Sequence, residues 1–401
     1  MNKTCIVFLL SLIPSLLFAQ HQLPLSSKGS VGVSTNIETY FFAEKLAVEH
    51  IGNYVFDTKG VDYSHQPIVH FGFKRFSKYQ NDPVIIRTAE ILRQIRDTLY
   101  DNGPILNYLL NQKEFPEAGL RFAALKKSDK SSGISKNEKV NALMAELTDS
   151  LRSFYIKANV RGFLAENSSF YKHALQEIGK DINKDIFLHM EKWYGQKFPF
   201  YELYISPAMP ITPGDDNYRG FGPQINSLKG KIPSMVVSSS KMLKLQNSLA
   251  DYHEFGFDNE PVTSFISSHE IGHSFVNPLL DPYMTSIIAD SALYTKNLEA
   301  ILTPNNIRSW HVTVIEHLVR LGEIRIAVSV KNEKEAARLR KLHIGEYNCV
   351  LIPLLEAKIV EYERNHKKYP DFKSYVPILI AYFHKLTPDI IDEQVRLYKN
   401  Y

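Results

Sequence analysis

Two histidines and one glutamate in the second half of the chain have types and a spacing that suit metal chemistry. Residues 269–273 have the sequence His-Glu-Ile-Gly-His. Because residues four apart share one face of a helix, His269 and His273 can both direct an imidazole to one metal ion. Glu270 lies beside them, where it can act as a base on an attacking water. This segment predicts a helix that supplies two ligands and a base to a zinc site.

The flanking residues predict the helix that this motif requires. Pro261 suits the first turn of a helix, and Asn277-Pro278 suits its end. Phe265 and Phe275 contribute to an apolar side that can face a core. The alternative interpretation is a pair of surface histidines on an ordinary helix, and this context disfavours it.

A catalytic zinc site also needs a third protein ligand and one open position. The sequence holds two cysteines, Cys5 and Cys349, too few for a cysteine-based site, and Leu279 stands where the extended form of the motif has a third histidine. A carboxylate further along the chain is therefore expected. The candidates are Asp281, Asp290, Glu299, Glu316 and Glu323.

The segment at residues 307–330 favours one of these carboxylates. Apolar residues cover nearly all sides of this predicted helix, so its polar stripe of Glu316, Arg320 and Glu323 should be buried. A buried carboxylate needs a cation or a metal, which favours Glu316 as the ligand, with Arg320 one turn on to orient a carboxylate or a substrate oxygen. The alternative is a simple Glu316–Arg320 ion pair. Glu299 is the second candidate ligand, because its segment is also helical and apolar around the acid.

The same residues predict a reaction. Glu270 would accept a proton from the attacking water and pass it to the leaving amine. The developing oxyanion needs a donor in addition to the metal. Four side chains could supply it or support the ligands from behind, and the sequence leaves the choice open: Arg320, His311, Tyr294 and His317.

Residues 1–19 have the features of a secretory signal peptide. Lys3 gives a positive end, residues 5–18 are almost wholly apolar, and Ala19 offers a small residue for cleavage. We predict cleavage after Ala19 or Gln20 and an exported protein, periplasmic or secreted, with no transmembrane anchor once the signal is removed.

Composition excludes several classes of partner. The chain has 401 residues, 44% apolar and 22% charged, which is typical of a globular protein. Its net charge of +4 is slight for this length and predicts neither nucleic-acid binding nor attraction to an anionic membrane. Cys349 is the one cysteine beyond the predicted signal peptide, so no internal disulfide is expected. The sequence does not indicate an oligomeric state.

The pattern of the chain predicts an α+β fold that is predominantly α-helical. β-branched and aromatic residues predict strands in a small sheet at residues 67–73, 200–206 and 234–239. A long amphipathic helix is expected at 83–110, and a polar surface loop at 126–139.

Three regions are expected after the signal peptide. They are a mainly helical N-terminal region at 20–195, a catalytic core at 196–330 and a helical C-terminal region at 331–401.

The motif at 269–273, followed by the sequence Glu-His-Leu-Val-Arg at 316–320, resembles the gluzincin arrangement, in which two motif histidines and a downstream glutamate bind zinc. The separation between the two parts is longer than in the thermolysin-like pattern. Residues 36–47, 76–83 and 273–278 are similar to an uncharacterised family of exported bacterial proteins known as a domain of unknown function.

The gluzincin resemblance implies a zincin-like core, bound zinc, and a peptide or protein substrate held as an added strand along a sheet edge. The residues implied for that edge are Met235, Val236, Val237, Ser238 and Ser239.

The leading hypothesis is an exported zinc metallopeptidase with Glu270 as its general base. The alternative is a non-catalytic envelope protein that keeps the zinc site for stability or for ligand capture. Zinc-dependent hydrolysis of a non-peptide amide is a third possibility. Glu270→Gln distinguishes them, because only the two hydrolases need its carboxylate.

Overall fold

Helices and one small mixed sheet make up the computed structural model, which describes residues 22–54, 58–99, 102–122, 138–212, 218–399 and 401. The predicted α+β, predominantly helical fold is confirmed. The predicted signal peptide at 1–19 and nearly all of the predicted loop at 126–139 lie outside the described residues. None of the helices in the described ranges combines the length and the apolarity that crossing a bilayer requires.

The sheet has the strand order β1-β2-β3-β6-β4, and β5 also pairs with β6. Strands β2, β3 and β6 are parallel to one another, whereas β1, β4 and β5 run antiparallel to their neighbours. The strands are β1 (Leu23–Ser26), β2 (Gly29–Gly32), β3 (Tyr201–Ile205), β4 (Gly220–Phe221), β5 (Gln224–Ser227) and β6 (Gly230–Val237). The strands predicted at 200–206 and 234–239 correspond to β3 and to the second half of β6.

The central strands separate two apolar cores. Successive side chains of a strand point to opposite faces of the sheet. Leu203 on β3 and Val237 on β6 therefore belong to one core, whereas Tyr204 and Val236 belong to the other. All five residues of β3 are buried, which explains why this strand is apolar or aromatic at nearly every position rather than alternating.

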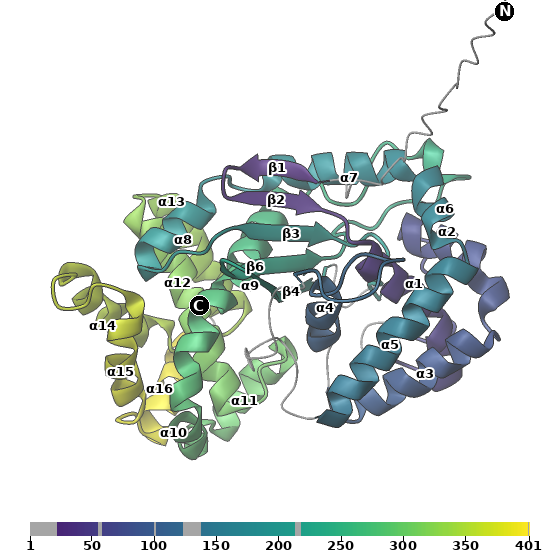
Figure 1. Cartoon of the computed structure of the whole chain (residues 1–401). Helices are drawn as coiled ribbons and strands as arrows, with labels where there is room; N and C mark the ends of the chain where they lie inside the picture. The colour runs from purple at the N-terminus through teal and green to yellow at the C-terminus, as the bar shows by residue number, and fades with distance from the viewer. Residues whose placement is uncertain (1–21, 55–57, 100–101, 123–137, 213–217, 400) are drawn as a thin grey trace, which may run out of the picture.

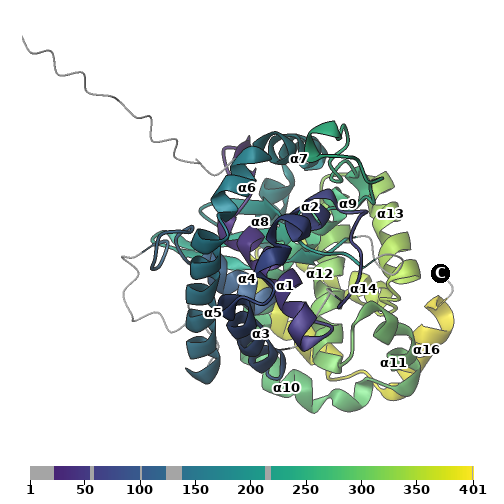
Figure 2. The same cartoon turned by 90° about the vertical axis from the view of Figure 1, so that its right-hand side faces the viewer.

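One core lies between the sheet and the N-terminal helices, which are at the right of Figure 1 and face the viewer in Figure 2. These helices are α1 (Thr35–Ile51), α2 (Pro67–Phe76), α3 (Pro83–Arg96), α4 (Gly103–Leu110), α5 (Glu138–Lys157) and α6 (Val160–Glu166).

The other core joins the sheet to the remaining α-helices, of which α14 to α16 lie at the left of Figure 1. The helices on this side are α7 (Ser168–Asp181), α8 (Ile186–Tyr194), α9 (Glu260–Leu280), α10 (Met284–Ala289), α11 (Lys296–Leu302), α12 (Trp310–Ser329), α13 (Glu333–Arg340), α14 (Ile352–Arg364), α15 (Phe372–Phe383) and α16 (Pro388–Tyr398). A π-helix, η6 (Lys341–Glu346), follows α13. Short 3₁₀ turns are η1 (Ser77–Tyr79), η2 (Leu249–Asp251), η3 (Asp281–Tyr283), η4 (Ser291–Leu293) and η5 (Thr303–Asn305).

Three sequence predictions about these elements are wrong. The strand expected at 67–73 is helix α2, because Pro67 opens a helix that buries Ile68 and Phe76 on one side. The single helix expected at 83–110 is divided into α3 and α4. Helix α9 does not end at Pro278 but continues to Leu280, with the proline in its last turn.

Candidate metal centre and its cleft

Two helices bring the three predicted metal ligands together. His269 and His273 lie on α9, and Glu316 lies on α12. His269 Nε2 is 3.5 Å from Glu316 Oε2, and His273 Nε2 is 3.6 Å from Glu316 Oε1. One ligand atom from each of the three residues lies within 4.8 Å of the other two. The alternative ligand, Glu299, is instead exposed on α11.

The chemistry and spacing of these donors fit a zinc ion. Tetrahedral zinc with ligands at its usual bond lengths holds its donor atoms about 3.4 Å apart. Each Nε2 atom lies close to this distance from one of the two oxygens of Glu316, Oε2 for His269 and Oε1 for His273. Two imidazoles and one carboxylate are also the ligands of a common type of catalytic zinc site, which leaves one position open.

Hydrogen bonds at the Nδ1 atoms of His269 and His273 orient the two rings. His269 Nδ1 donates to Glu323 Oε1 at 2.9 Å, and His273 Nδ1 donates to Asn277 Oδ1 at 3.2 Å. With the proton on Nδ1, each Nε2 keeps its lone pair for a metal. The glycine inside the motif helps to bring the helices together, because a Cβ on Gly272 would lie only 3.0 Å from Val319 on α12.

Behind the ligands lies a buried polar layer. Glu323, 4% exposed, accepts hydrogen bonds from His269 and from His343 Nε2, the latter at 3.0 Å. His343 Nδ1 lies 3.4 Å from Arg320, which donates to Glu316 Oε2 at 3.3 Å and stacks 4.1 Å above the ring of Tyr347. The contact of Arg320 with Glu316 is the ion pair that the sequence predicted as one of two alternatives.

This layer was only partly visible in the sequence. Glu323 lies on the same polar stripe as Glu316 and Arg320, and it was a candidate ligand rather than a partner of His269. His343 was missed, because the π-helix that turns it towards Glu323 has no signature in the sequence.

Burial sets the protonation of the site. Burial, aided by the positive charge of Arg320, lowers the pKa of His269 to about 3, so this imidazole is neutral and able to bind a metal. The pKa of Glu270 is raised to about 7, chiefly by burial; His273 and Arg320 act to lower this pKa, and the Glu316 and Glu323 carboxylates act to raise it. A carboxylate whose pKa lies near neutrality is suited to accept and return a proton.

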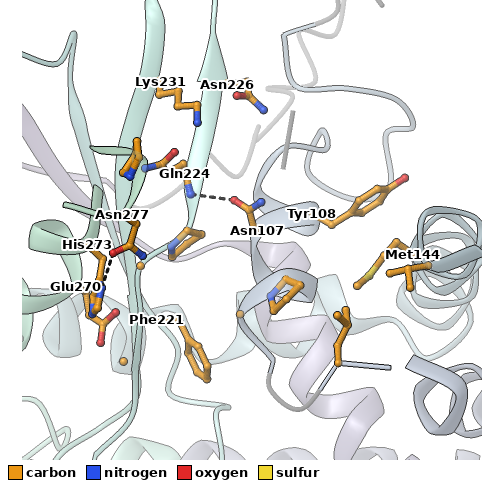
Figure 3. Close-up of a pocket in the computed structure, with 18 of the residues that line it drawn as sticks. Asn107, Tyr108, Met144, Phe221, Gln224, Asn226, Lys231, Glu270, His273 and Asn277 are labelled. Atoms are coloured by element: carbon orange, nitrogen blue, oxygen red, sulfur yellow. Dashed lines mark hydrogen bonds between the residues drawn. The ribbon is translucent and has the colours of Figure 1, made fainter. Parts of the chain in front are cut away.

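A cavity of about 720 Å³ opens beside this cluster. Glu270, His273 and Asn277 line one wall, and Figure 3 shows Asn107, Tyr108 and Met144 on the opposite wall, which α4 and α5 form. The cluster therefore faces a cleft between the helices of the N-terminal half and α9.

The substrate edge strand implied for Met235, Val236, Val237, Ser238 and Ser239 is a wrong prediction. Strand β6 is interior, because β3 pairs with one side of it and β4 and β5 with the other. Beyond its end, Ser238 N still donates to Arg219 O at 3.0 Å. The outermost strands at this side of the sheet, within the described residues, are β4 and β5.

Strand β4 passes directly over the proposed base. A Cβ on Gly222 would lie 2.6 Å from the carbonyl oxygen of Glu270, and a Cβ on Gly220 would lie 3.1 Å from Glu270 Oε1. Only glycine permits this approach of a strand to α9. The sequence did not reveal β4, because a two-residue strand has no alternating pattern.

Of the four predicted oxyanion or supporting residues, Arg320 contacts the cluster through Glu316. The other three make local hydrogen bonds. The Tyr294 hydroxyl donates to the Ile307 carbonyl, the His311 ring bonds Ser309 Oγ, and the His317 ring bonds the Thr313 carbonyl. These bonds do not link the three side chains to the cleft.

The fold and the cluster define a predominantly helical α+β protein with a potential metal centre at one wall of a cleft. The chain belongs to the family described as a domain of unknown function (DUF4932), whose model matches residues 37–382 and so includes the whole cluster. No curated protein and no solved structure matches the chain.

Proposed function

We propose that this protein is an exported zinc-dependent metallopeptidase with Glu270 as its general base. The observation that carries the proposal is that Glu270 and His273 line the same cleft, next to a cluster whose donor atoms fit zinc. Export is proposed from the signal-like sequence at residues 1–19.

Each side chain has a defined part in this reaction. Zinc, when bound, would lower the pKa of water and polarise the scissile carbonyl. Glu270 takes one proton as the water oxygen forms a bond to the carbonyl carbon, and it returns that proton to the amine as the C–N bond breaks. Glu323 and Asn277 hold the imidazoles of His269 and His273 in place. Arg320 holds the Glu316 carboxylate in the same way.

Metal analysis combined with a peptide-library digest tests this proposal. We expect about one zinc ion per chain, since the cluster is a single three-ligand site. Glu270→Gln should keep the zinc and lose cleavage by about 10²–10⁴-fold, the usual contribution of a general base. Glu299→Gln is the matched control, because it removes an exposed carboxylate on α11 and should change neither quantity.

Two other outcomes would replace the proposal. Zinc binding with a large stabilisation against heat, but no cleavage of any peptide by the unmodified protein, would support a non-catalytic zinc-binding protein. Cleavage of cell-wall fragments but not of peptides, lost in Glu270→Gln, would identify a hydrolase of another amide. A purified protein that binds no zinc would contradict all three.

A further inference from the structure

Helix α4 covers the sheet edge immediately beyond the proposed base. Strands β4 and β5 lie one after the other along β6, with Gly222-Pro223 between them. A Cβ on Gly220 or Gly222 would meet Glu270, and β5 begins two residues after Gly222, at Gln224. A peptide held along β4 in an extended conformation would meet β5 next.

Asn107 on α4 and Asn111, the residue that follows α4, occupy main-chain groups of β5. Gln224 N donates to Asn107 Oδ1 at 2.9 Å, and Asn226 N donates to Asn111 Oδ1 at 2.8 Å. Asn111 Nδ2 in turn donates to Gln224 O at 2.9 Å. A carboxamide carries the same donor and acceptor as a peptide bond, so these side chains pair with β5 as a neighbouring strand would.

The wall of the cavity at α4 and α5 carries a group of apolar side chains. Leu99, Pro104, Tyr108, Val140 and Met144 line it together with the polar Asn107 and Asn141, whereas Glu270, His273 and Asn277 line the opposite side. Figure 3 shows Tyr108 and Met144 on this wall. This end can bury an apolar side chain, but the strand that would guide a longer peptide past it is already paired with α4.

We propose that the cleft is one-sided, so that a peptide lies along β4 and ends against α4 and α5 with an apolar terminal residue in the cavity. The inference rests on the proposed function and narrows its substrates to short peptides with a large apolar residue at one end. The other end of the peptide can be extended, because it leaves the cleft on the side away from β5.

Binding to the zinc-loaded Glu270→Gln variant tests the inference separately from catalysis. One series of peptides carries a leucine-ended core lengthened at its N-terminus, and a second series carries the same core lengthened at its C-terminus. We expect extension at one end to weaken binding by about tenfold or more and extension at the other end to have little effect. Equal tolerance of both extensions, or equal loss from both, would overturn the one-sided cleft.

Two variants locate the restriction. Asn107→Ala combined with Asn111→Ala uncovers β5 and should restore binding of the extended peptides. Should this variant fail to fold, Met144→Ala should reduce the preference for a terminal leucine over alanine by about fivefold or more, because it removes part of the apolar wall. Ile156→Ala is the matched control, since Ile156 is on α5 but 63% exposed and outside the cavity. An unchanged leucine preference in Met144→Ala would contradict the assignment of the apolar end.

Cleavage by the unmodified protein separates the two proposals. Hydrolysis of both peptide series at equal rates would support the metallopeptidase and reject the one-sided cleft. One-sided binding without hydrolysis would support the cleft and reject the peptidase.

Discussion

Two carboxylates of this protein have a pKa that burial raises to about 7, yet Glu38 is fully buried whereas Glu270 is partly exposed. Glu38 on α1 has no exposed surface, and it accepts hydrogen bonds from the hydroxyls of Ser206 and Tyr171 and from the backbone N–H of Ala208. Glu270 on α9 lines the cleft beside the proposed zinc ligands. A raised pKa alone therefore does not mark a catalytic group.

The two carboxylates differ in the groups with which they can exchange a proton. Glu38 is held by fixed donors in the interior and does not line the cleft. Glu270 reaches a cavity, and glycines replace side chains on the strand that crosses it. Glu38 links α1 to Ser206, the residue after β3, whereas the proposed function assigns proton transfer to Glu270.

The largest expected effect is on kcat, which should fall when Glu270 is replaced but not when Glu38 is replaced. Glu270→Gln should lower kcat by about 10²–10⁴-fold, because it removes the proton acceptor. Glu38→Gln should leave kcat within about twofold, since Glu38 contacts no residue of the cleft cluster. Steady-state hydrolysis of one peptide by both zinc-loaded variants makes the comparison, and a comparable loss in Glu38→Gln would remove the distinction.

The free energy of unfolding should show the opposite order, with the larger loss when Glu38 is replaced. Glu38→Ala leaves two buried hydroxyls and one N–H without their acceptor and opens a cavity, so we expect a loss of about 3 kcal/mol in the free energy of unfolding. Glu270→Ala should change it by less than about 1 kcal/mol, because its carboxylate already faces the cleft. Urea denaturation of the zinc-free proteins measures both values. Equal losses would mean that Glu270 is as structural as Glu38.

The pH dependence of stability should identify Glu38 directly. Its pKa is about 7 when folded and near the ordinary 4.5 when unfolded. The unfolded state therefore releases the proton first, and the stability that Glu38 contributes is complete below about pH 4.5 and is lost as the pH rises through 7. Relative to Glu38→Gln, the zinc-free protein should lose about 3 kcal/mol over this range. Parallel curves for the two proteins would show that the Glu38 proton is not linked to folding.

The fold was predictable where one segment contained the whole signal. Strand β3 is an unbroken apolar and aromatic segment, and α12 is apolar on nearly every side, so each could be recognised without its neighbours. Helix α2 was mistaken for a strand because Ile68 and Val69 favour β-structure. Ile68, Gly72 and Phe76 nevertheless recur at the helical spacing of four and are all buried.

The site, like the fold, was predictable only where one segment contained the whole signal. His269, Glu270 and His273 could be found from one turn of helix, and Glu316 from the burial expected for α12. The arrangement of β4, β5 and α4 depends on contacts between segments more than a hundred residues apart, such as Asn107 with Gln224. No local pattern in the chain encodes that pairing.

Glu323 sharpens the comparison, because it is buried like Glu38 but joined to the cluster. It accepts hydrogen bonds from the rings of His269 and His343. Glu323→Gln keeps an oxygen for His269 Nδ1 but removes the negative charge that makes this imidazole a stronger donor to a metal. We expect zinc affinity to fall by about 10–100-fold, measured by competition with a chelator.

Glu335→Gln is the control for Glu323, since Glu335 is partly exposed on α13 and pairs with Arg338 rather than with a histidine of the cluster. Unchanged zinc affinity in Glu323→Gln would place Glu323 with Glu38, as a carboxylate that stabilises the fold alone. A loss confined to Glu323→Gln would instead mean that an enclosed carboxylate acts on the site when a histidine ligand lies between them. Connection to the cluster, rather than burial or pKa, would then separate the functional carboxylates from Glu38.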